Sequence, residues 1–192
     1  MKAMLQRLSL LLALVLGTAW GANDQLVPIN NGMNTLKIFG TNFKVFRAWR
    51  ENYNAHGFDV VTFYSSNNDT WGLVPIFDES RTHEKLELTA GGGADCRLHD
   101  FRMLVSPDGS HAQLLVASRD PGNSYVDLKT VHFVYYELEK NEEALPGAPL
   151  FFFEAVKRVE SRGAYCDVND AMNDELHLGA QSGFCGKDCP ER

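Results

Sequence analysis

The feature that most constrains this fold is a series of short apolar runs separated by turns rich in proline and glycine. Two turns are explicit, Ser106-Pro107-Asp108-Gly109-Ser110 and Asp120-Pro121-Gly122-Asn123. Proline presets one turn torsion and glycine accepts a positive φ, so both segments favour a reversal of the chain. Short strands at regular spacing between such turns are typical of a β-sandwich or barrel. We therefore expect a mostly β protein, an antiparallel β-sandwich.

The runs between the turns have the composition and alternation of strands. The expected strands cover residues 36–39, 43–49, 58–64, 71–77, 85–89, 97–105, 112–118, 125–139 and 150–159. Pro75 makes the run 71–77 an edge strand or a bulged strand, because proline cannot donate to a ladder. In the run 85–89, Leu86 and Leu88 share one face. In the run 43–49, the candidates for the buried face are Phe43, Val45, Phe46 and Trp49.

The later strands carry many aromatic side chains. Phe151, Phe152 and Phe153 fall in one expected strand, so alternate rings must face opposite ways. Tyr135 and Tyr136 likewise point to opposite faces of their strand. Either these are core strands buried on both faces, or one aromatic sheet face is covered by a second subunit in a homodimer.

One short helix is expected near the C-terminus, over about residues 167–177. Asp167 can cap its first turn, and Gly179 follows its last. The acidic residues here do not make an EF-hand calcium loop, which requires Gly at its sixth position and Glu at its twelfth. Counted from Asp167, those positions hold Met172 and Leu178.

The N-terminus has the three parts of a secretory signal. Lys2 and Arg7 give a positive start, residues 8–16 form an apolar run, and small residues follow. This run is shorter than the roughly 20 residues that span a bilayer as a helix, so we expect a cleaved signal and no membrane anchor. Cleavage after Ala19 or after Gly21 would suit a signal peptidase.

With cleavage after Gly21, residues 1–21 are the signal peptide and residues 22–192 form a single domain. Removing Lys2 and Arg7 from the 18 basic residues leaves 16 against 25 acidic residues, a net charge of −9. A domain this acidic is repelled by phosphate backbones. Nucleic acid and anionic membranes are therefore not expected as partners.

Four cysteines remain in the exported chain: Cys96, Cys166, Cys185 and Cys189. An even number in an oxidising compartment favours two disulfides, which allow three pairings. We favour Cys96–Cys166, which leaves Cys185–Cys189 to close a small loop. Zinc is the alternative, but only Cys185 and Cys189 are spaced as a ligand pair, so we expect no metal.

No catalytic motif is complete in this sequence. The serine-nucleophile pattern G-x-S-x-G lacks its closing glycine at residues 122–126, and the S-x-x-K pattern is absent. The six histidines are scattered singly, without the H-x-H or H-E-x-x-H pairs of a hydrolytic metal site. We expect neither an enzyme nor a cofactor. The alternative is a small hydrolase whose site converges from separate strands, with His132 or His99 beside an acidic partner.

The segment 49–59 mixes aromatic, charged and amide groups in a compact stretch. As a candidate recognition surface it offers Trp49, Arg50, Asn52, His56 and Asp59. It can equally be a hairpin connection, in which Asn54 and Gly57 make the turn and Arg50 pairs with Asp59 or Glu51.

The chain resembles the CarG-like carbapenem intrinsic-resistance proteins, small periplasmic proteins of Gram-negative bacteria. The resemblance lies in the signal peptide, the single β-rich domain, the stretch from Trp49 to Asp59 that leads into residues 60–64, and the segment from Leu145 to Phe153. It implies a periplasmic β-sandwich that can form a homodimer and that protects against carbapenems without hydrolysing them. It supplies no catalytic residue. A periplasmic module that binds another ligand, an envelope protein or a small molecule, is the alternative.

Overall fold

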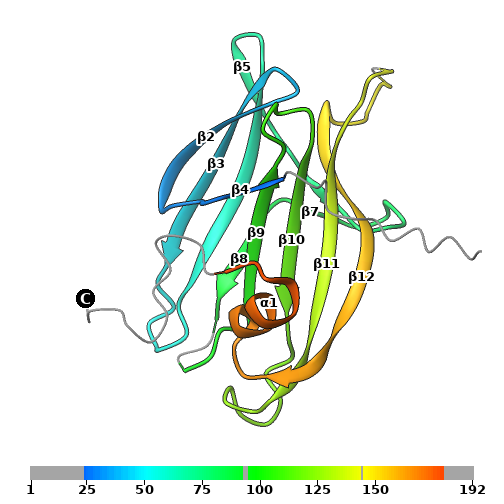
Figure 1. Cartoon of the computed structure of the whole chain (residues 1–192). Helices are drawn as coiled ribbons and strands as arrows, with labels where there is room; N and C mark the ends of the chain where they lie inside the picture. Colours follow the sequence, from blue (N-terminus) through cyan, green and yellow to red (C-terminus); the bar gives the residue numbers. More distant parts are fainter. Residues whose placement is uncertain (1–23, 93–94, 144, 180–192) are drawn as a thin grey trace, which may run out of the picture.

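The strands expected from the turn pattern pair into a curled sheet with a helix on its outer side (Figure 1). This computed structural model describes residues 24–92, 95–143 and 145–179. Within them, the strands are β1 (Gln25–Val27), β2 (Gly32–Ile38), β3 (Thr41–Arg50), β4 (Phe58–Asn67), β5 (Thr70–Leu73), β6 (Ile76–Phe77), β7 (Glu84–Lys85), β8 (Leu88–Gly91), β9 (His99–Val105), β10 (Ala112–Ser118), β11 (Lys129–Lys140) and β12 (Phe151–Tyr165), and the helix is α1 (Val168–Leu176). The predictions of a mostly β protein and of one short helix after the last strand are confirmed.

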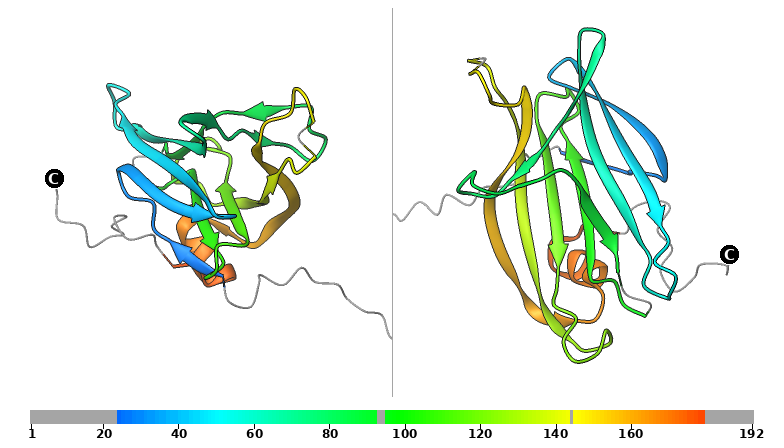
Figure 2. Two further views of the ribbon diagram at one scale, coloured as in Figure 1. Left: turned by 90° about the horizontal axis from the view of Figure 1, so that it is seen from above. Right: turned by 180° about the vertical axis from the view of Figure 1, so that it is seen from behind.

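The strands form one continuous, open sheet in the order β2-β3-β4-β8-β9-β10-β11-β12-β6-β7, with β1 beside β9 and β5 beside β4. Among the described strands, every pair is antiparallel except β12 with β6. Two separate sheets, as in the expected sandwich, are therefore not confirmed. Instead the single sheet curls, so that β3 and β4 lie opposite β12 (Figure 2). The Phe43 and Phe151 ring centroids are 5.0 Å apart across this space, and those of Phe63 and Phe153 are 5.2 Å apart.

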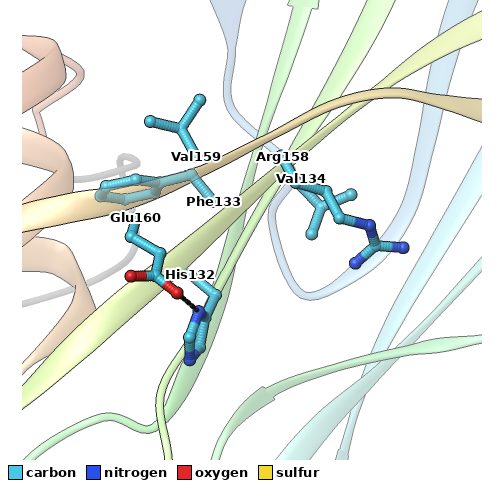
Figure 3. A pocket seen from close by; sticks show the side chains of 6 residues that line it. All are labelled: His132, Phe133, Val134, Arg158, Val159 and Glu160. Atoms are coloured by element: carbon cyan, nitrogen blue, oxygen red, sulfur yellow. Dashed lines mark ion pairs between the residues drawn. The ribbon is translucent and has the colours of Figure 1, made fainter.

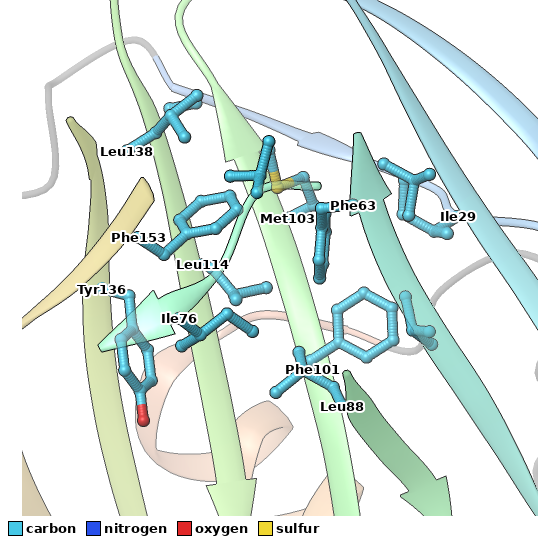
Figure 4. Close-up of a cluster of buried hydrophobic side chains, with 14 of the residues drawn as sticks. Ile29, Phe63, Ile76, Leu88, Phe101, Met103, Leu114, Tyr136, Leu138 and Phe153 are labelled. Atoms are coloured by element: carbon cyan, nitrogen blue, oxygen red, sulfur yellow. The ribbon is translucent and has the colours of Figure 1, made fainter. Parts of the chain in front are cut away.

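The concave face of the sheet holds the main apolar core (Figure 4). Because side chains alternate along a strand, every second residue points inward. On β3 these residues are Phe43, Val45 and Arg47. The prediction that Phe46 and Trp49 are buried is wrong. Phe46 points outward, and Trp49 lies at the end of the strand, where 54% of it is exposed.

A second apolar cluster lies on the outer face, beneath α1. It consists of Leu115, Ala117, Val131, Phe133 and Tyr135 from the sheet and of Val168, Ala171 and Met172 from the helix. β11 is therefore buried on both faces, one of the two alternatives open at the level of sequence.

The clustered phenylalanines are also buried within the chain. Phe151 and Phe153 belong to the concave core. Phe152 points to the other face, where Phe77 packs at 5.8 Å between ring centroids and the Arg81 guanidinium lies 4.9 Å from the ring centroid. These residues therefore form no exposed aromatic face, and the homodimer stays a prediction.

Local chemistry fixes both ends of α1. Asp167 is the N-cap, and its Oδ1 accepts a hydrogen bond of 2.8 Å from the Asn169 backbone N–H. The end of the helix near residue 177 is as expected, but the residue that terminates it is His177 rather than Gly179, because His177 adopts the left-handed conformation with φ of 56°. A residue in that conformation turns the backbone so that its N–H can satisfy the last carbonyls of the helix.

A disulfide joins Cys96, before β9, to Cys166, before α1, and this is the pairing that the sequence favours. The expected signal peptide (residues 1–21) and the expected Cys185–Cys189 pair lie outside the described residues. None of the helical structure in the described ranges combines the length and the apolar character needed to cross a bilayer.

Two of the expected strands are each divided into two shorter strands. Pro75 divides the run 71–77 into β5 and β6. The run 85–89 divides between β7 and β8, so that Leu88 is buried but Leu86 is 50% exposed. Leu86 and Leu88 therefore do not share a buried face.

Candidate functional site

Four strands carry polar side chains side by side at one end of the concave face, and we call these residues the polar row. The row consists of His99 on β9, Ser118 on β10, His132 on β11 and Glu160 on β12. The sheet register places each opposite the next: His99 with Ser118, Ser118 with His132, and His132 with Glu160. Directly opposed residues in antiparallel strands have Cβ atoms about 5 Å apart. The row therefore spans roughly 14 Å, at about 4.8 Å between strands.

On β9, β10 and β11, each member of the polar row is two residues away from a residue that faces the core. Because such residues share one face of a strand, the polar row lies on the same face as the core. Those neighbours form the adjacent apolar row, Phe101, Val116 and Val134, followed on β12 by Arg158. Phe101 and Val134 belong to the core, and Val116 packs against it. The candidate site therefore consists of the polar row and, beside it, the apolar row of Phe101, Val116 and Val134, which we call the apolar floor.

A shallow hollow of about 310 Å³ lies at the β11–β12 part of this region (Figure 3). Its lining residues are His132, Phe133, Val134, Arg158, Val159 and Glu160. The register of the two strands shifts on both sides of this segment, between Thr130 and His132 and between Tyr135 and Tyr136. Such irregularities re-aim side chains and are frequent next to functional sites.

Two ion pairs order the hollow. The His132 Nδ1 lies 3.5 Å from the Glu160 Oε1, and both side chains are substantially exposed. The Arg158 Nε donates a hydrogen bond of 2.9 Å to the Glu79 Oε1. Within the described residues, the two terminal nitrogens of Arg158 make no hydrogen bond, so they remain able to donate.

Charged groups of both signs lie around this end of the concave face. Burial lowers the pKa of His99 below its usual 6.5, and the nearby charges of Lys85 and Arg119 lower it further. His99 is therefore neutral at pH 7 and offers one N–H. The charges of Lys85 and Arg119 act at the His99 end of the row. At the hollow, the cation Arg158 is accompanied by the carboxylates of Glu79 and Glu160.

The polar row contains the residue types of a serine hydrolase without the contacts of one. A nucleophilic serine must donate a hydrogen bond to the imidazole that accepts its proton. Within the described residues, the Ser118 hydroxyl has no hydrogen bond to His99 or to His132. The predicted pairing of His132 with an acidic partner is present, as Glu160, whereas His99 has no carboxylate partner in the described part of the chain.

A second group of hydroxyl, imidazole and carboxylate lies in the loop between β6 and β7. The His83 Nδ1 lies 2.9 Å from the Asp78 Oδ2 and 3.0 Å from the Thr82 Oγ1. A catalytic relay needs its acid and its nucleophile on different nitrogens of the imidazole. Here both partners share one nitrogen, so this group orders the loop. The described residues also contain no group of three or more His, Cys, Asp or Glu that could hold a metal ion.

The candidate recognition residues of segment 49–59 are neighbours whose contacts are mostly structural, and their role in recognition stays a prediction. The segment is the connection of the β3–β4 hairpin. Asp59 points inward and pairs with Arg47 at 2.6 Å, with only 13% of its side chain exposed. The expected pairing of Arg50 with Asp59 or Glu51 is wrong: the Arg50 Nη1 donates a hydrogen bond of 2.8 Å to the Asn52 Oδ1.

The two remaining candidates have structural contacts. The Trp49 ring covers Gly57, where a Cβ atom would lie 2.2 Å from the ring. The His56 ring packs on Tyr125 with 4.4 Å between the centroids, joining this hairpin to the loop before β11. The hairpin interpretation of the segment thus accounts for the contacts of all five residues.

Comparison with known proteins places this architecture in a family. The family model described as carbapenem resistance protein CarG-like matches residues 29–174. The chain belongs to the CarG-like family. This confirms the resemblance that the sequence suggested, and it makes the chain a protein related to carbapenem resistance. The match spans the whole polar row.

A solved structure supports the fold of this CarG-like chain. It is titled "Crystal structure of CarG", is 22% identical, and superposes with a TM-score of 0.65 over 81% of this chain and 99% of that chain. At this identity the likeness shows the fold. No curated protein sequence matches the chain significantly.

Sequence reasoning identified two members of the polar row in this CarG-like chain, His99 and His132. It missed Ser118, Glu160 and Arg158. The signal that joins them is the register of β9 to β12, which becomes visible only once each strand is aligned with its neighbour.

Proposed function

We propose that this CarG-like protein is exported to the periplasm and contributes to carbapenem resistance by binding the drug without hydrolysing it. The observation that carries the proposal is the polar row beside its apolar floor. This site has hydrogen-bond donors for a polar ligand, but its serine is not hydrogen-bonded to a base. Such a site supports recognition rather than acyl transfer.

The scale of the site agrees with a small ligand. Small-molecule sites are clefts of about 300–1,000 Å³, lined by apolar side chains with a few placed polar groups. The hollow of about 310 Å³ is at the lower end of this range.

Drug susceptibility tests the biological part of this proposal. We expect a strain that lacks the gene to be more sensitive to a carbapenem than its parent. The full-length gene should restore resistance, whereas a version encoding only residues 22–192 should not, because its product would stay in the cytosol. Unchanged susceptibility of the deletion strain would contradict a role in resistance, and full rescue by the leaderless version would contradict export.

A further inference from the structure

The polar row and the row beside it, which ends in Arg158, together offer three features that a small anionic ligand requires: donors, a cation and apolar neighbours. Ser118 and His132 are adjacent on neighbouring strands and offer a hydroxyl and an imidazole. Arg158 is opposite Val134 and is therefore diagonal to His132, on the same face. In Figure 3, Val159 points away from the side on which His132, Glu160 and Arg158 lie.

From this arrangement we infer that the polar row is a carboxylate-binding subsite, with Arg158 as its main cationic contact. The ring of the ligand lies in the hollow against the accessible edge of Val134, and its carboxylate lies at the terminal nitrogens of Arg158, on the side of His132 and its neighbour Ser118. The inference rests on the proposed function, which supplies a carbapenem, a bicyclic carboxylate, as the ligand.

The chemistry of arginine suits this role. A guanidinium is always charged, and its planar set of N–H donors matches the two oxygens of a carboxylate. Glu79 engages the Nε of Arg158 at 2.9 Å. This contact holds the Nε side of the guanidinium, and the two terminal nitrogens are left without a hydrogen bond among the described residues.

The two nearby carboxylates do not prevent an anion from binding. Glu79 is occupied by Arg158, and Glu160 lies against the His132 imidazole. The Glu79 carboxylate is thus paired with a cation, and Glu160 has a neighbouring imidazole. Lys85 and Arg119, whose charges act on His99, add positive potential from the other end of the row.

Calorimetric titration of the purified mature protein tests the inference. The probes are a carbapenem and its methyl ester, which differ only in the charge of the carboxylate. The test variant is Arg158→Gln. The matched control is Arg81→Gln, because Arg81 also pairs with a glutamate and is similarly exposed, at 56% against 53% for Arg158. Thermal unfolding of each variant verifies that it is folded.

We expect Arg158→Gln to weaken binding of the acid by about tenfold or more, the usual size of a lost charge-assisted hydrogen bond. The wild type should discriminate acid from ester by a similar factor, and Arg158→Gln should lose this discrimination. Arg81→Gln should bind like the wild type. A second variant, Ser118→Ala, should weaken binding by a smaller factor.

The outcomes separate the two proposals. If the wild type binds neither probe, the proposed function fails and the subsite fails with it. If the wild type binds but treats acid and ester alike, the carboxylate subsite is wrong while drug binding stands. The subsite is equally overturned if Arg158→Gln binds the acid as tightly as Arg81→Gln does.

Discussion

At the scale of single residues, the most consequential side chain is Arg102, which is fully buried. Its guanidinium bonds to Asp100, to the Asn169 side chain and to the backbone carbonyls of Phe101, Leu178 and Gly179. It therefore joins β9 to both ends of α1. An arginine in an alternating strand is typical of the solvent face, so periodicity alone could not place it beneath a helix.

Substitution of Arg102 should be severe. We expect Arg102→Gln to lower the free energy of unfolding by about 3–5 kcal/mol, because the Asp100 carboxylate would remain buried without its partner. Arg81→Gln, which breaks a pair between an exposed arginine and a glutamate that is 22% exposed, should cost less, about 1 kcal/mol. Denaturant unfolding of both variants measures the difference. Equal losses would refute the structural role of Arg102.

The turn residue Asp108 should make the stability of the protein depend on pH in the acidic range. The Asp108 carboxylate accepts hydrogen bonds from the Ser110 backbone N–H and from the Ser110 and Ser106 hydroxyls, which lower its pKa from 3.8 to about 2. A lowered pKa means that this stabilisation is present above pH 3.8 and is lost as the pH falls through about 2. At pH 5, the wild type should therefore have a higher melting temperature than Asp108→Asn. The difference in melting temperature should vanish near pH 2, and a constant difference would show that ionisation is irrelevant.

At the scale of elements, the hairpins follow from local chemistry and the other pairings do not. Gly109 adopts φ of +69°, and its N–H donates to the Ser106 carbonyl, as the turn sequence predicts. By contrast, the strand β8 lies between β4 and β9, and β6 runs parallel to β12. Such pairings depend on which distant surfaces meet after the sheet curls, so turn residues carry no information about them.

The junction between β9 and α1 provides a test at this scale. Cys96 and Cys166 close a loop across 70 residues, and the cap residue Asp167 accepts a hydrogen bond of 3.2 Å from the Arg97 backbone N–H beside them. Replacing both cysteines by alanine should lower the free energy of unfolding by about 2–5 kcal/mol, mainly through the entropy of the unfolded chain. Unfolding in denaturant, with and without reductant, measures this. Reductant should destabilise the wild type but leave the variant unchanged, and the opposite pattern would contradict the bond.

At the scale of the whole molecule, curling of one sheet creates both the core and the site. The members of the polar row are distributed between residues 99 and 160, and only the register of four strands brings them together. The sequence therefore predicts the mostly β class, the helix and the family. It cannot predict the neighbours of His132, because a shift of one residue in register would turn them to the other face.

The central claim, binding without hydrolysis, is tested most directly by following the fate of the drug. The purified mature protein is incubated with a carbapenem, binding is measured by calorimetry, and the recovered drug is analysed by mass spectrometry. We predict saturable binding and release of chemically intact drug. Recovery of ring-opened drug in excess over the protein, or the absence of any binding, would contradict the account.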